Sequence, residues 1–294
     1  MTTAREPRRA PLVWRLASLV KIEHTLFALP FAYVGALLAR RSTGALPSWR
    51  ELLWITLAMV GARSLAMGLN RLVDREIDAR NPRTAGRELP SGRLTALQVS
   101  AFCAAALALL VYAVFKLASV VRILWPIPVA AFVVYPYLKR VTWLCHLWLG
   151  ATIGLAPLAA WLALGAPAAK AAFALWIAVA CWVTGFDLFY SLFDLEIDRE
   201  QGLHSFAVRF GVTGVFRAAR TLHLITIAAL LAAGVAGGAG LFWGLGVAAV
   251  SVLLLYEHLI ASPSDLRRLN AAFFTVNGAI GVVFLAFVVA DALV

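Results

Sequence analysis

Charged residues are scarce in this chain: only 14% of its 294 residues are Asp, Glu, Lys or Arg, whereas 62% are hydrophobic. A soluble domain of this length could not bury so large an apolar fraction, so the composition excludes that class and predicts a membrane protein. Cysteine is almost absent, with three residues, Cys103, Cys145 and Cys181, all inside apolar runs. We therefore expect buried thiols, and neither disulfides nor a cysteine metal site.

Acidic residues are also few, 15 against 26 Lys and Arg, which gives a formal net charge of +11. A basic balance can indicate nucleic-acid binding, but here most of the basic residues lie in alternate loops between apolar runs. That distribution is typical of cytoplasmic loops under the positive-inside rule. We therefore predict a cytoplasmic N-terminus and no nucleic-acid partner.

Apolar runs long enough to cross a bilayer recur along the whole chain. The first run follows a basic tail but no convincing cleavage site, so we expect a retained helix and not a signal peptide. The predicted fold class is all-α, a polytopic membrane protein with nine transmembrane helices, whose odd number places Val294 outside the cell. The runs lie at about 22–40, 52–77, 95–115, 119–137, 143–163, 170–196, 212–233, 240–260 and 270–292.

Two segments place polar side chains at regular intervals inside this apolar chain. In "NRLVDREID", Asn70, Asp74 and Asp78 are four residues apart, a spacing that puts them on one face of a helix. The second segment, "DLFYSLFDLEID", repeats the pattern with Asp187, Tyr190, Asp194 and Asp198. The shared "EID" triplets indicate an internal duplication within a single domain, 1–294: two pseudo-repeats, about 22–137 and 143–260, followed by a last helix.

Carboxylates at membrane depth cost about 2.5–3.5 kcal/mol each on insertion scales, so they rarely persist without a partner. Both motifs are predicted at the cytoplasmic ends of helices that run inward, where the helix macrodipole is negative. Such a site repels anions and attracts hard cations, and Mg²⁺ fits because carboxylate and phosphate oxygens complete its octahedron. Each motif is followed by basic residues suited to phosphate: Arg80, Arg83, Arg87 and Arg93, then Arg199, His204 and Arg209.

Mg²⁺ held by aspartates, with arginines around it, favours a diphosphate site, and its place in a membrane favours a lipid diphosphate. Two alternatives stand beside this interpretation. The acidic helix ends could be ordinary solvated termini, although two matching motifs with basic loops make that less favourable. An ion-coupled transporter could use the same carboxylates, but transporters place such groups near the midplane, whereas these gather at one membrane face.

The chain resembles the UbiA superfamily of intramembrane prenyltransferases at these residues. That family carries an NxxxDxxxD motif after its second helix and a DxxxD motif, preceded by DxxY, after its sixth, and both patterns are complete here. Further matches are Arg63 and the segments "RELPSGRLT", "YPYLKRVTWLCHLWLG" and "HSFAVRFG". The resemblance covers essentially the whole chain and implies nine helices around a central cavity in the cytoplasmic (inner) membrane of a bacterium, with the active site near the cytoplasmic face.

The resemblance implies a polyprenyltransferase that moves a polyprenyl group from its diphosphate to a hydroxyaryl acid in quinone biosynthesis, with Mg²⁺ as cofactor, membrane lipids around it and no obligate protein partner. Five residues would hold the metal: Asn70, Asp74, Asp78, Asp194 and Asp198. Catalytic roles would fall to Asp74, Asp194, Asn70, Lys139 and Tyr190. Substrate binding would involve Arg63, Arg83, Arg87, Tyr135, His146 and Asp187.

Two segments depart from the 4-hydroxybenzoate subgroup of that family. The first helix reads "KIEHTLFALPFA" without a Pro-Ile-Gly signature, and Cys145–His146 replaces a Pro-Gln pair. Both segments are similar to those of another branch of the family, whose members include enzymes of menaquinone synthesis. The acceptor could therefore be 4-hydroxybenzoate or a dihydroxynaphthoate. His24 and His146 could each contact the acceptor or simply pack between helices. His223 and His258 are expected at the membrane interface.

Arg63 is predicted two turns before Asn70, about 10 Å deeper in the membrane at the usual helical rise. A guanidinium at that depth keeps its charge and needs an anionic partner. Two partners fit: Asp187, in a structural ion pair across the cavity, or a carboxylate of the aromatic substrate. The second would make the acceptor an acid and not a neutral quinol.

The distribution of Lys and Arg predicts that both motif loops face the cytoplasm. Single cysteines placed at Gly86 and Gly202, in a background without the three native cysteines, should resist an impermeant thiol reagent in intact cells. Both should react once the membrane is permeabilised, which is the control for reactivity. Labelling of both positions from outside would invert the predicted topology.

Overall fold

The computed structural model describes residues 11–20, 25–41, 45–261 and 266–294, and within them all regular secondary structure is helical. The all-α prediction is confirmed. The basic tail and His24 lie outside the described residues. The helices are α1 (Leu12–Val20), α2 (Thr25–Arg41), α3 (Trp49–Val73), α4 (Arg75–Arg80), α5 (Ala96–Val114), α6 (Ser119–Leu124), α7 (Pro126–Leu138), α8 (Cys145–Ala163), α9 (Lys170–Ser191), the 3₁₀ turn η2 (Leu192–Asp194), α10 (Leu195–Glu200), α11 (Phe206–Ala236), α12 (Leu241–Ile260) and α13 (Leu266–Leu293).

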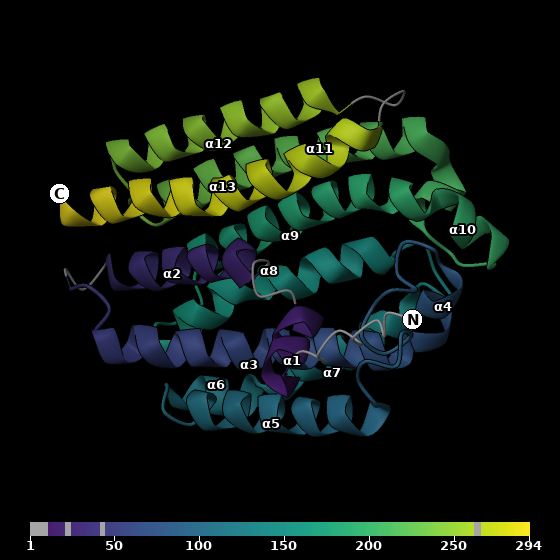
Figure 1. Ribbon diagram of the computed structural model, residues 1–294. Coiled ribbons are helices and arrows are strands. Elements are labelled where there is room, and N and C mark those ends of the chain that lie inside the picture. Colours follow the sequence, from purple (N-terminus) through teal and green to yellow (C-terminus); the bar gives the residue numbers. More distant parts are fainter. Residues whose placement is uncertain (1–10, 21–24, 42–44, 262–265) are drawn as a thin grey trace, which may run out of the picture.

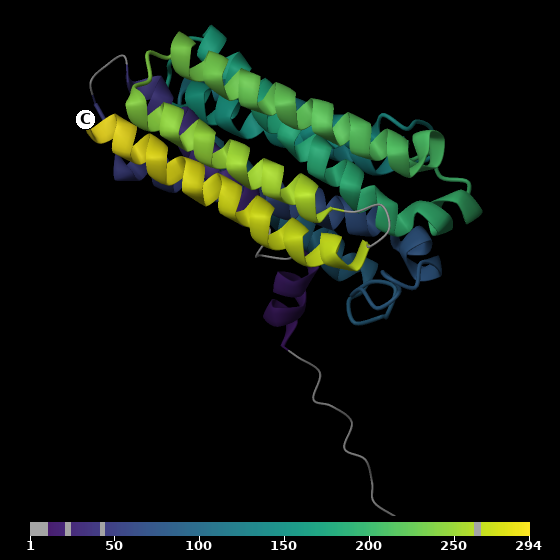
Figure 2. The same cartoon turned by 90° about the horizontal axis from the view of Figure 1, so that it is seen from above.

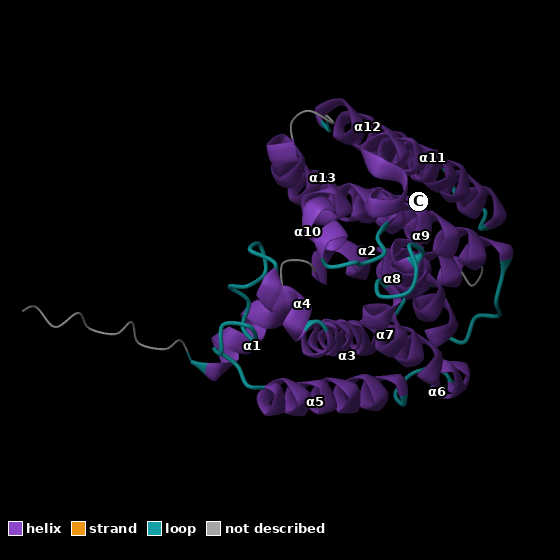
Figure 3. Cartoon of the chain, turned by 90° about the vertical axis from the view of Figure 1, so that its right-hand side faces the viewer, coloured by secondary structure: helices purple, strands orange, loops and turns teal. Residues whose placement is uncertain are grey.

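The long helices run side by side along one axis (Figure 1). Seen end-on, α3, α5, α6 and α7 form one side of the bundle and α9, α11, α12 and α13 the other (Figure 3). In the described part of the chain, eight helices are long and apolar enough to cross a membrane. The protein is therefore an integral membrane protein. The first predicted span corresponds to α2, which has 17 described residues, so the count of nine stays a prediction.

Helix starts follow from short polar signals between the apolar runs. Ser48 and Glu51 form a capping box at the start of α3, and Thr95 and Gln98 form another at the start of α5. In each box the hydroxyl of the cap residue accepts a hydrogen bond from the backbone N–H three residues on, while the Glu or Gln side-chain oxygen accepts one from the N–H of the cap residue. These boxes explain why the predicted starts at 52 and 95 lie within a few residues of the observed ones.

Close packing in the middle of the bundle depends on small residues. Gly150 and Gly154, one turn apart on α8, face α9, where an added Cβ would collide with the backbone of Ala180. Small residues four apart let two membrane helices approach until their backbones touch, and van der Waals contact then stabilises the pair. α8 also packs on α2 and α7, so this contact joins the two sides of the bundle.

Both acidic motifs interrupt the regular α-helix, within the spans predicted at about 52–77 and 170–196. α3 ends at Val73, and Asp74 has φ −90° and ψ 4° before α4 begins. In the second motif α9 gives way to the 3₁₀ turn that ends at Asp194. Aspartate has a low helix propensity because its side chain competes for backbone and nearby donors. The four-residue spacing survives, since Asp74 N–H still donates to Asn70 O and Asp78 N–H to Asp74 O.

A second polar cluster lies inside the bundle, between α9, α11, α12 and α13. Trp182 Nε1 donates to Asn277 Oδ1 at 2.8 Å, and Asn277 Nδ2 donates to Glu257 Oε1 at 2.8 Å. Beside them, His223 Nδ1 lies 3.0 Å from His258 Nε2. Asn277 and Glu257 are 0% and 1% exposed, so these bonds replace water that the site excludes. The sequence did not indicate that the two histidines would face each other.

Asn277→Ala should lower the thermal stability of the purified, detergent-solubilised protein. The change removes two buried hydrogen bonds and leaves Trp182 Nε1 and Glu257 Oε1 without them, a loss of about 1–3 kcal/mol. Ser251→Ala is the matched control, because Ser251 Oγ bonds only within its own helix, to Val247 O. An unfolding midpoint that drops no further for Asn277→Ala than for the control would show that the cluster adds nothing to stability.

Candidate active site

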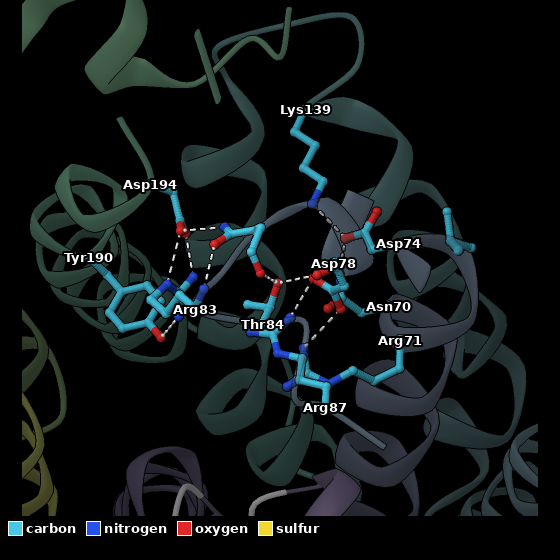
Figure 4. Close-up of polar contacts among 12 residues, drawn as sticks. Asn70, Arg71, Asp74, Asp78, Arg83, Thr84, Arg87, Lys139, Tyr190 and Asp194 are labelled. Carbon is cyan, nitrogen blue, oxygen red and sulfur yellow. Dashed lines mark hydrogen bonds and ion pairs between the residues drawn. The ribbon is translucent and has the colours of Figure 1, made fainter. Parts of the chain in front are cut away.

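The two acidic motifs meet at one end of the bundle, opposite the C-terminus, where α4 and α10 lie (Figure 1). The loop 81–95 completes this end and carries the arginines that follow the first motif. Figure 4 shows the resulting cluster, with Asp74 and Asp78 on one side and Tyr190 and Asp194 on the other.

Asp74 is 2% exposed and is held by two cations from the end of α7. Lys139 Nζ lies 2.7 Å from its Oδ2, and Arg140 Nη2 lies 3.2 Å from its Oδ1. Asn70 Nδ2 donates to Oδ2 at 3.0 Å. Arg140 is itself fixed by donating to the backbone carbonyl of Val73 at 3.0 Å, where α3 ends. The carboxylate therefore lies where the ends of two helices meet.

Asp78 is 4% exposed and is neutralised from the loop. Arg87 Nη1 donates to its Oδ1 at 2.7 Å, and Arg71 Nη1 lies 4.0 Å from its Oδ2. Thr84 Oγ1 donates to the backbone oxygen of Asp78 at 2.9 Å, which holds the loop against α4. Asp78 and Arg87, assigned separately to metal and substrate from sequence, are direct partners here.

Arg83 joins the first motif's loop to the second motif. Its Nε donates to Asp194 Oδ1 at 2.9 Å, its Nη2 donates to Asp194 Oδ2, and its Nη1 donates to the Tyr190 hydroxyl at 2.5 Å. Asn81 Nδ2 also donates to Asp194 Oδ1, at 2.8 Å. Burial by itself lowers the pKa of Arg83, but the hydrogen bonds and charge of Asp194, with Tyr190, outweigh that effect and raise its pKa. Arg83 is therefore a permanent cation in this loop.

Asp198 occupies the edge of the cluster on α10. It is only partly buried, and its backbone oxygen accepts a hydrogen bond from Leu203 N–H at 2.8 Å. The next residue, His204, donates its N–H to Lys139 O at 2.7 Å. The segment after the second motif is therefore bonded to the end of α7.

A cavity of about 530 Å³ leads from the charged cluster into the apolar interior. Six predicted site residues line its polar end: Arg63, Asn70, Arg87, Tyr135, Asp187 and Tyr190. Deeper in the bundle, the lining consists of aliphatic and aromatic side chains from α3, α5, α6, α7 and α8. The cavity can therefore hold a molecule with a long apolar part and an anionic end.

Each cavity-lining residue of α9 has a cavity-lining counterpart on α3. The offset that relates Asp74 to Asp194 carries Arg63, Ala66, Met67 and Asn70 of α3 onto Val183, Phe186, Asp187 and Tyr190 of α9. α3 lines the cavity at further positions that have no such counterpart: Ile55, Ala58, Met59, Ala62 and Arg71. Positions three and four apart form one helix face. α3 and α9 therefore face the cavity with equivalent sides of the two helices.

His146 lies beside the cavity and pairs with Asp187, its Nδ1 being 2.7 Å from Asp187 Oδ2. Asp187, one of the two partners predicted for Arg63, thus has a neighbour that the sequence did not indicate. Sequence reasoning also missed the roles of Arg71, Arg140 and Asn81. Asn81 lies three residues after Asp78, the last residue of the first motif, and next to the loop arginines. That position in the sequence could have indicated that Asn81 belongs to the site.

α1 supports the loop from outside the bundle, from which it projects to one side (Figure 2). Ser18 Oγ donates to Glu88 Oε1 at 2.7 Å, and Arg15 Nη1 donates to the backbone oxygen of Arg93 at 2.5 Å. Arg93 in turn lies 3.5 Å from Glu88, so it faces the loop and not the aspartates. These contacts hold the segment that carries Arg83 and Arg87.

The carboxylate set fits a hard divalent cation by its chemistry. In the described part of the chain no three Asp, Glu, His or Cys side chains converge on one point, and Asp74, Asp78 and Asp194 are each paired with Lys or Arg. Two buried carboxylate oxygens make no hydrogen bond and have only an ion-pair neighbour: Asp74 Oδ1, 3.2 Å from Arg140 Nη2, and Asp78 Oδ2, 4.0 Å from Arg71 Nη1. Oxygens of this kind are the ligands that Mg²⁺ prefers.

The fold and the site together define an integral membrane protein with an apolar cavity that ends in paired carboxylates and guanidinium groups. The sequence model of the UbiA prenyltransferase family matches residues 28–287. The chain therefore belongs to this family, as the resemblance of its motifs predicted, and it is a prenyltransferase.

Known relatives agree with this assignment over most of their length. The 4-hydroxybenzoate octaprenyltransferase of Aliivibrio fischeri (strain MJ11) is 26% identical over 276 residues, which cover 92% of this chain and 91% of the relative. The enzyme of the same name from Pseudoalteromonas translucida (strain TAC 125) is 32% identical over 230 residues, covering 74% and 75%.

Solved structures show the same arrangement of helices. The apo structure of a UbiA homolog from Aeropyrum pernix K1 has 30% sequence identity and a TM-score of 0.82, and the match covers 92% of this chain and 98% of that one. A UbiA homolog from Archaeoglobus fulgidus bound to DMAPP and Mg²⁺ has a TM-score of 0.73 over 95% of this chain and 99% of that one. At 19% identity, that second match shows the fold alone.

Proposed function

We propose that the protein transfers a polyprenyl group from a polyprenyl diphosphate to a hydroxyaryl acid, in a step of quinone biosynthesis that depends on Mg²⁺. The observation that carries the proposal is the cavity, whose apolar length ends at a cluster of carboxylates and cations. An apolar chain with an anionic head has the same distribution of charge. Relatives named 4-hydroxybenzoate octaprenyltransferase support an aromatic acceptor, and the UbiA homologs solved with DMAPP or GPP and Mg²⁺ support the donor class.

Mg²⁺, when bound, would neutralise the charge of the departing diphosphate. Asp74, Asp78, Asp194 and Asp198 would hold it, with Asn70 at the inner edge of the cluster. Arg83, Arg87 and Lys139 now bond to these aspartates, and the same cations would turn towards the diphosphate oxygens. Fixed donors aimed at developing negative charge need little reorganisation during reaction, and they favour heterolysis of the C–O bond.

The reaction balances without an oxidant. The bond between the allylic carbon and the diphosphate oxygen breaks, and its electron pair leaves with the diphosphate. A ring carbon ortho to the acceptor's hydroxyl supplies the electron pair of the new C–C bond, and the proton on that carbon departs to restore aromaticity. The apolar walls of the cavity would exclude water, which would otherwise capture the allylic cation.

The acceptor would bind at the polar end of the cavity. Arg63 and Asp187 both line it, from α3 and α9. A guanidinium matches a carboxylate in charge and geometry, so Arg63 would bind the acid group of the acceptor and hold the ring below the diphosphate. We place the protein in the bacterial inner membrane, with this site near the cytoplasmic face.

Asp74→Asn and Asp194→Asn should each lower turnover by at least about 100-fold while the protein stays inserted and folded, because the site loses a charge needed for the divalent cation. Chelation of divalent cations should abolish turnover, and Mg²⁺ or Mn²⁺ should restore it. Glu76→Gln and Glu196→Gln are matched controls: both glutamates belong to the "EID" triplets, yet their side chains are exposed. Prenylated product is measured by mass in detergent or in vesicles.

Near-wild-type activity of either aspartate variant would contradict the diphosphate site. If the purified protein made no prenylated product but moved a solute across vesicles in an aspartate-dependent way, the transporter interpretation would replace it.

Arg63→Ala should raise the KM of the acceptor, or lower its kcat/KM, by at least about tenfold, with little change in the KM of the polyprenyl diphosphate. The reason is that only the acceptor's carboxylate would lose its partner. A decarboxylated acceptor should be a poor substrate for the wild type and should lose little more in the variant. Equal loss with both acceptors would assign Arg63 to the diphosphate or to the structure of the bundle.

A further inference from the structure

His146 and Asp187 form a pair at the junction of two helices. His146 is the second residue of α8, and Asp187 lies one turn before the end of α9. Their side chains are 13% and 17% exposed, and Nδ1 lies 2.7 Å from Oδ2. A carboxylate accepts hydrogen bonds, so with Asp187 ionised the imidazole donates through Nδ1.

The two side chains differ in their relation to the cavity. Asp187 lines it beside Tyr135 and Tyr190, whereas His146 is not among the described residues that do. The second ring nitrogen of His146, Nε2, is buried and has no hydrogen bond, so Nδ1 makes the ring's polar contact with Asp187. The Asp187 carboxylate therefore faces the cavity, and the imidazole of His146 contacts it from outside the cavity lining.

The position of His146 is itself fixed. Its neighbour Cys145 is buried, with Sγ 3.7 Å from the backbone oxygen of His204, and His204 N–H donates to Lys139 O at 2.7 Å. These contacts tie the first turn of α8 to the segments that carry Asp198 and Lys139. A carboxylate on α9 thus receives its hydrogen bond from a donor anchored to the active site.

We propose that His146 is a positioning residue: it holds Asp187 Oδ2, so that Oδ1 accepts a hydrogen bond from the hydroxyl group of the aromatic acceptor. This inference rests on the proposed function and deepens it. With its hydroxyl bound to Asp187 and its acid group bound to Arg63, the acceptor would be held at both of its polar ends. A hydroxyl that donates to a carboxylate carries more negative charge on its oxygen. That charge raises the electron density on the ring carbons ortho to the hydroxyl, where the new C–C bond forms.

The arrangement selects a class of acceptor. The ring must carry a hydroxyl group and an acid group at separate positions, so that each reaches its own helix. A ring whose hydroxyl is methylated offers Asp187 no donor and brings an ether oxygen towards a carboxylate. Loss of a hydrogen bond inside a desolvated site that was built to make it discriminates strongly, because the protein group is left unpaired.

The test compares two substitutions of His146 in the full-length membrane enzyme. His146→Asn keeps an amide N–H near the place of Nδ1, whereas His146→Leu keeps the bulk and removes the donor. His146→Leu should lower acceptor kcat/KM by at least about tenfold and leave the KM of the polyprenyl diphosphate within about twofold, and His146→Asn should retain acceptor kcat/KM within about threefold. The acceptors are 4-hydroxybenzoate and a dihydroxynaphthoate.

A double-mutant cycle with Asp187→Asn separates positioning from packing. If His146 acts through Asp187, His146→Leu should change acceptor kcat/KM by less than about twofold in the Asp187→Asn background. Independent, multiplicative losses would overturn the proposal, as would equal losses for both substrates or unchanged acceptor kinetics in His146→Leu. If wild-type enzyme made product with neither acceptor, the proposed function would fail first and this inference with it.

Discussion

Neutralisation of buried carboxylates at one end of a membrane-embedded bundle is the constraint on which the rest of this structure depends. Asp74 and Asp78 are almost wholly removed from water, and a carboxylate there is stable only if a cation and hydrogen-bond donors lie beside it. The cations come from separate parts of the chain, Lys139 from the end of α7 and Arg87 from the loop. The ends of α3 and α7 and the loop 81–95 must therefore lie next to one another at the same end of the bundle. This requirement fixes where the mouth of the cavity lies.

The same constraint explains why the ends of the motif helices are irregular. Asp74, which pairs with Lys139 and Arg140, is the residue at which α3 ends. The second motif breaks at Asp194, where Arg83 and Asn81 approach from the loop. In each case the low helix propensity of aspartate and its long-range polar contacts act in the same direction.

The sequence alone predicted the helices and the two motifs, because apolar runs, capping residues and four-residue spacing are local signals. It predicted the groups at the site's mouth but not their pairing, such as Arg83 with Asp194 or His146 with Asp187. Periodicity places a residue on a face of its helix, but which faces meet is decided by packing over the whole bundle. For the same reason the bond between Asn277 and Glu257 could not be predicted, since the two residues lie on different helices, α13 and α12, and share no local pattern.

The cavity also shows how two helices with equivalent lining positions can carry different side chains. Equivalent positions of α3 and α9 line it, which supports the proposed duplication, yet their side chains have diverged. Arg63 on α3 corresponds to Val183 on α9, and Asp187 on α9 corresponds to Met67 on α3. Each helix thus contributes one charge at a level where its counterpart is apolar. Near the mouth both halves keep their aspartates, so the proposed diphosphate site is pseudo-symmetric, whereas the cavity wall that carries Arg63 and Asp187 is asymmetric. The proposed acceptor, a ring with two different polar ends, would need such an asymmetric wall to take one orientation.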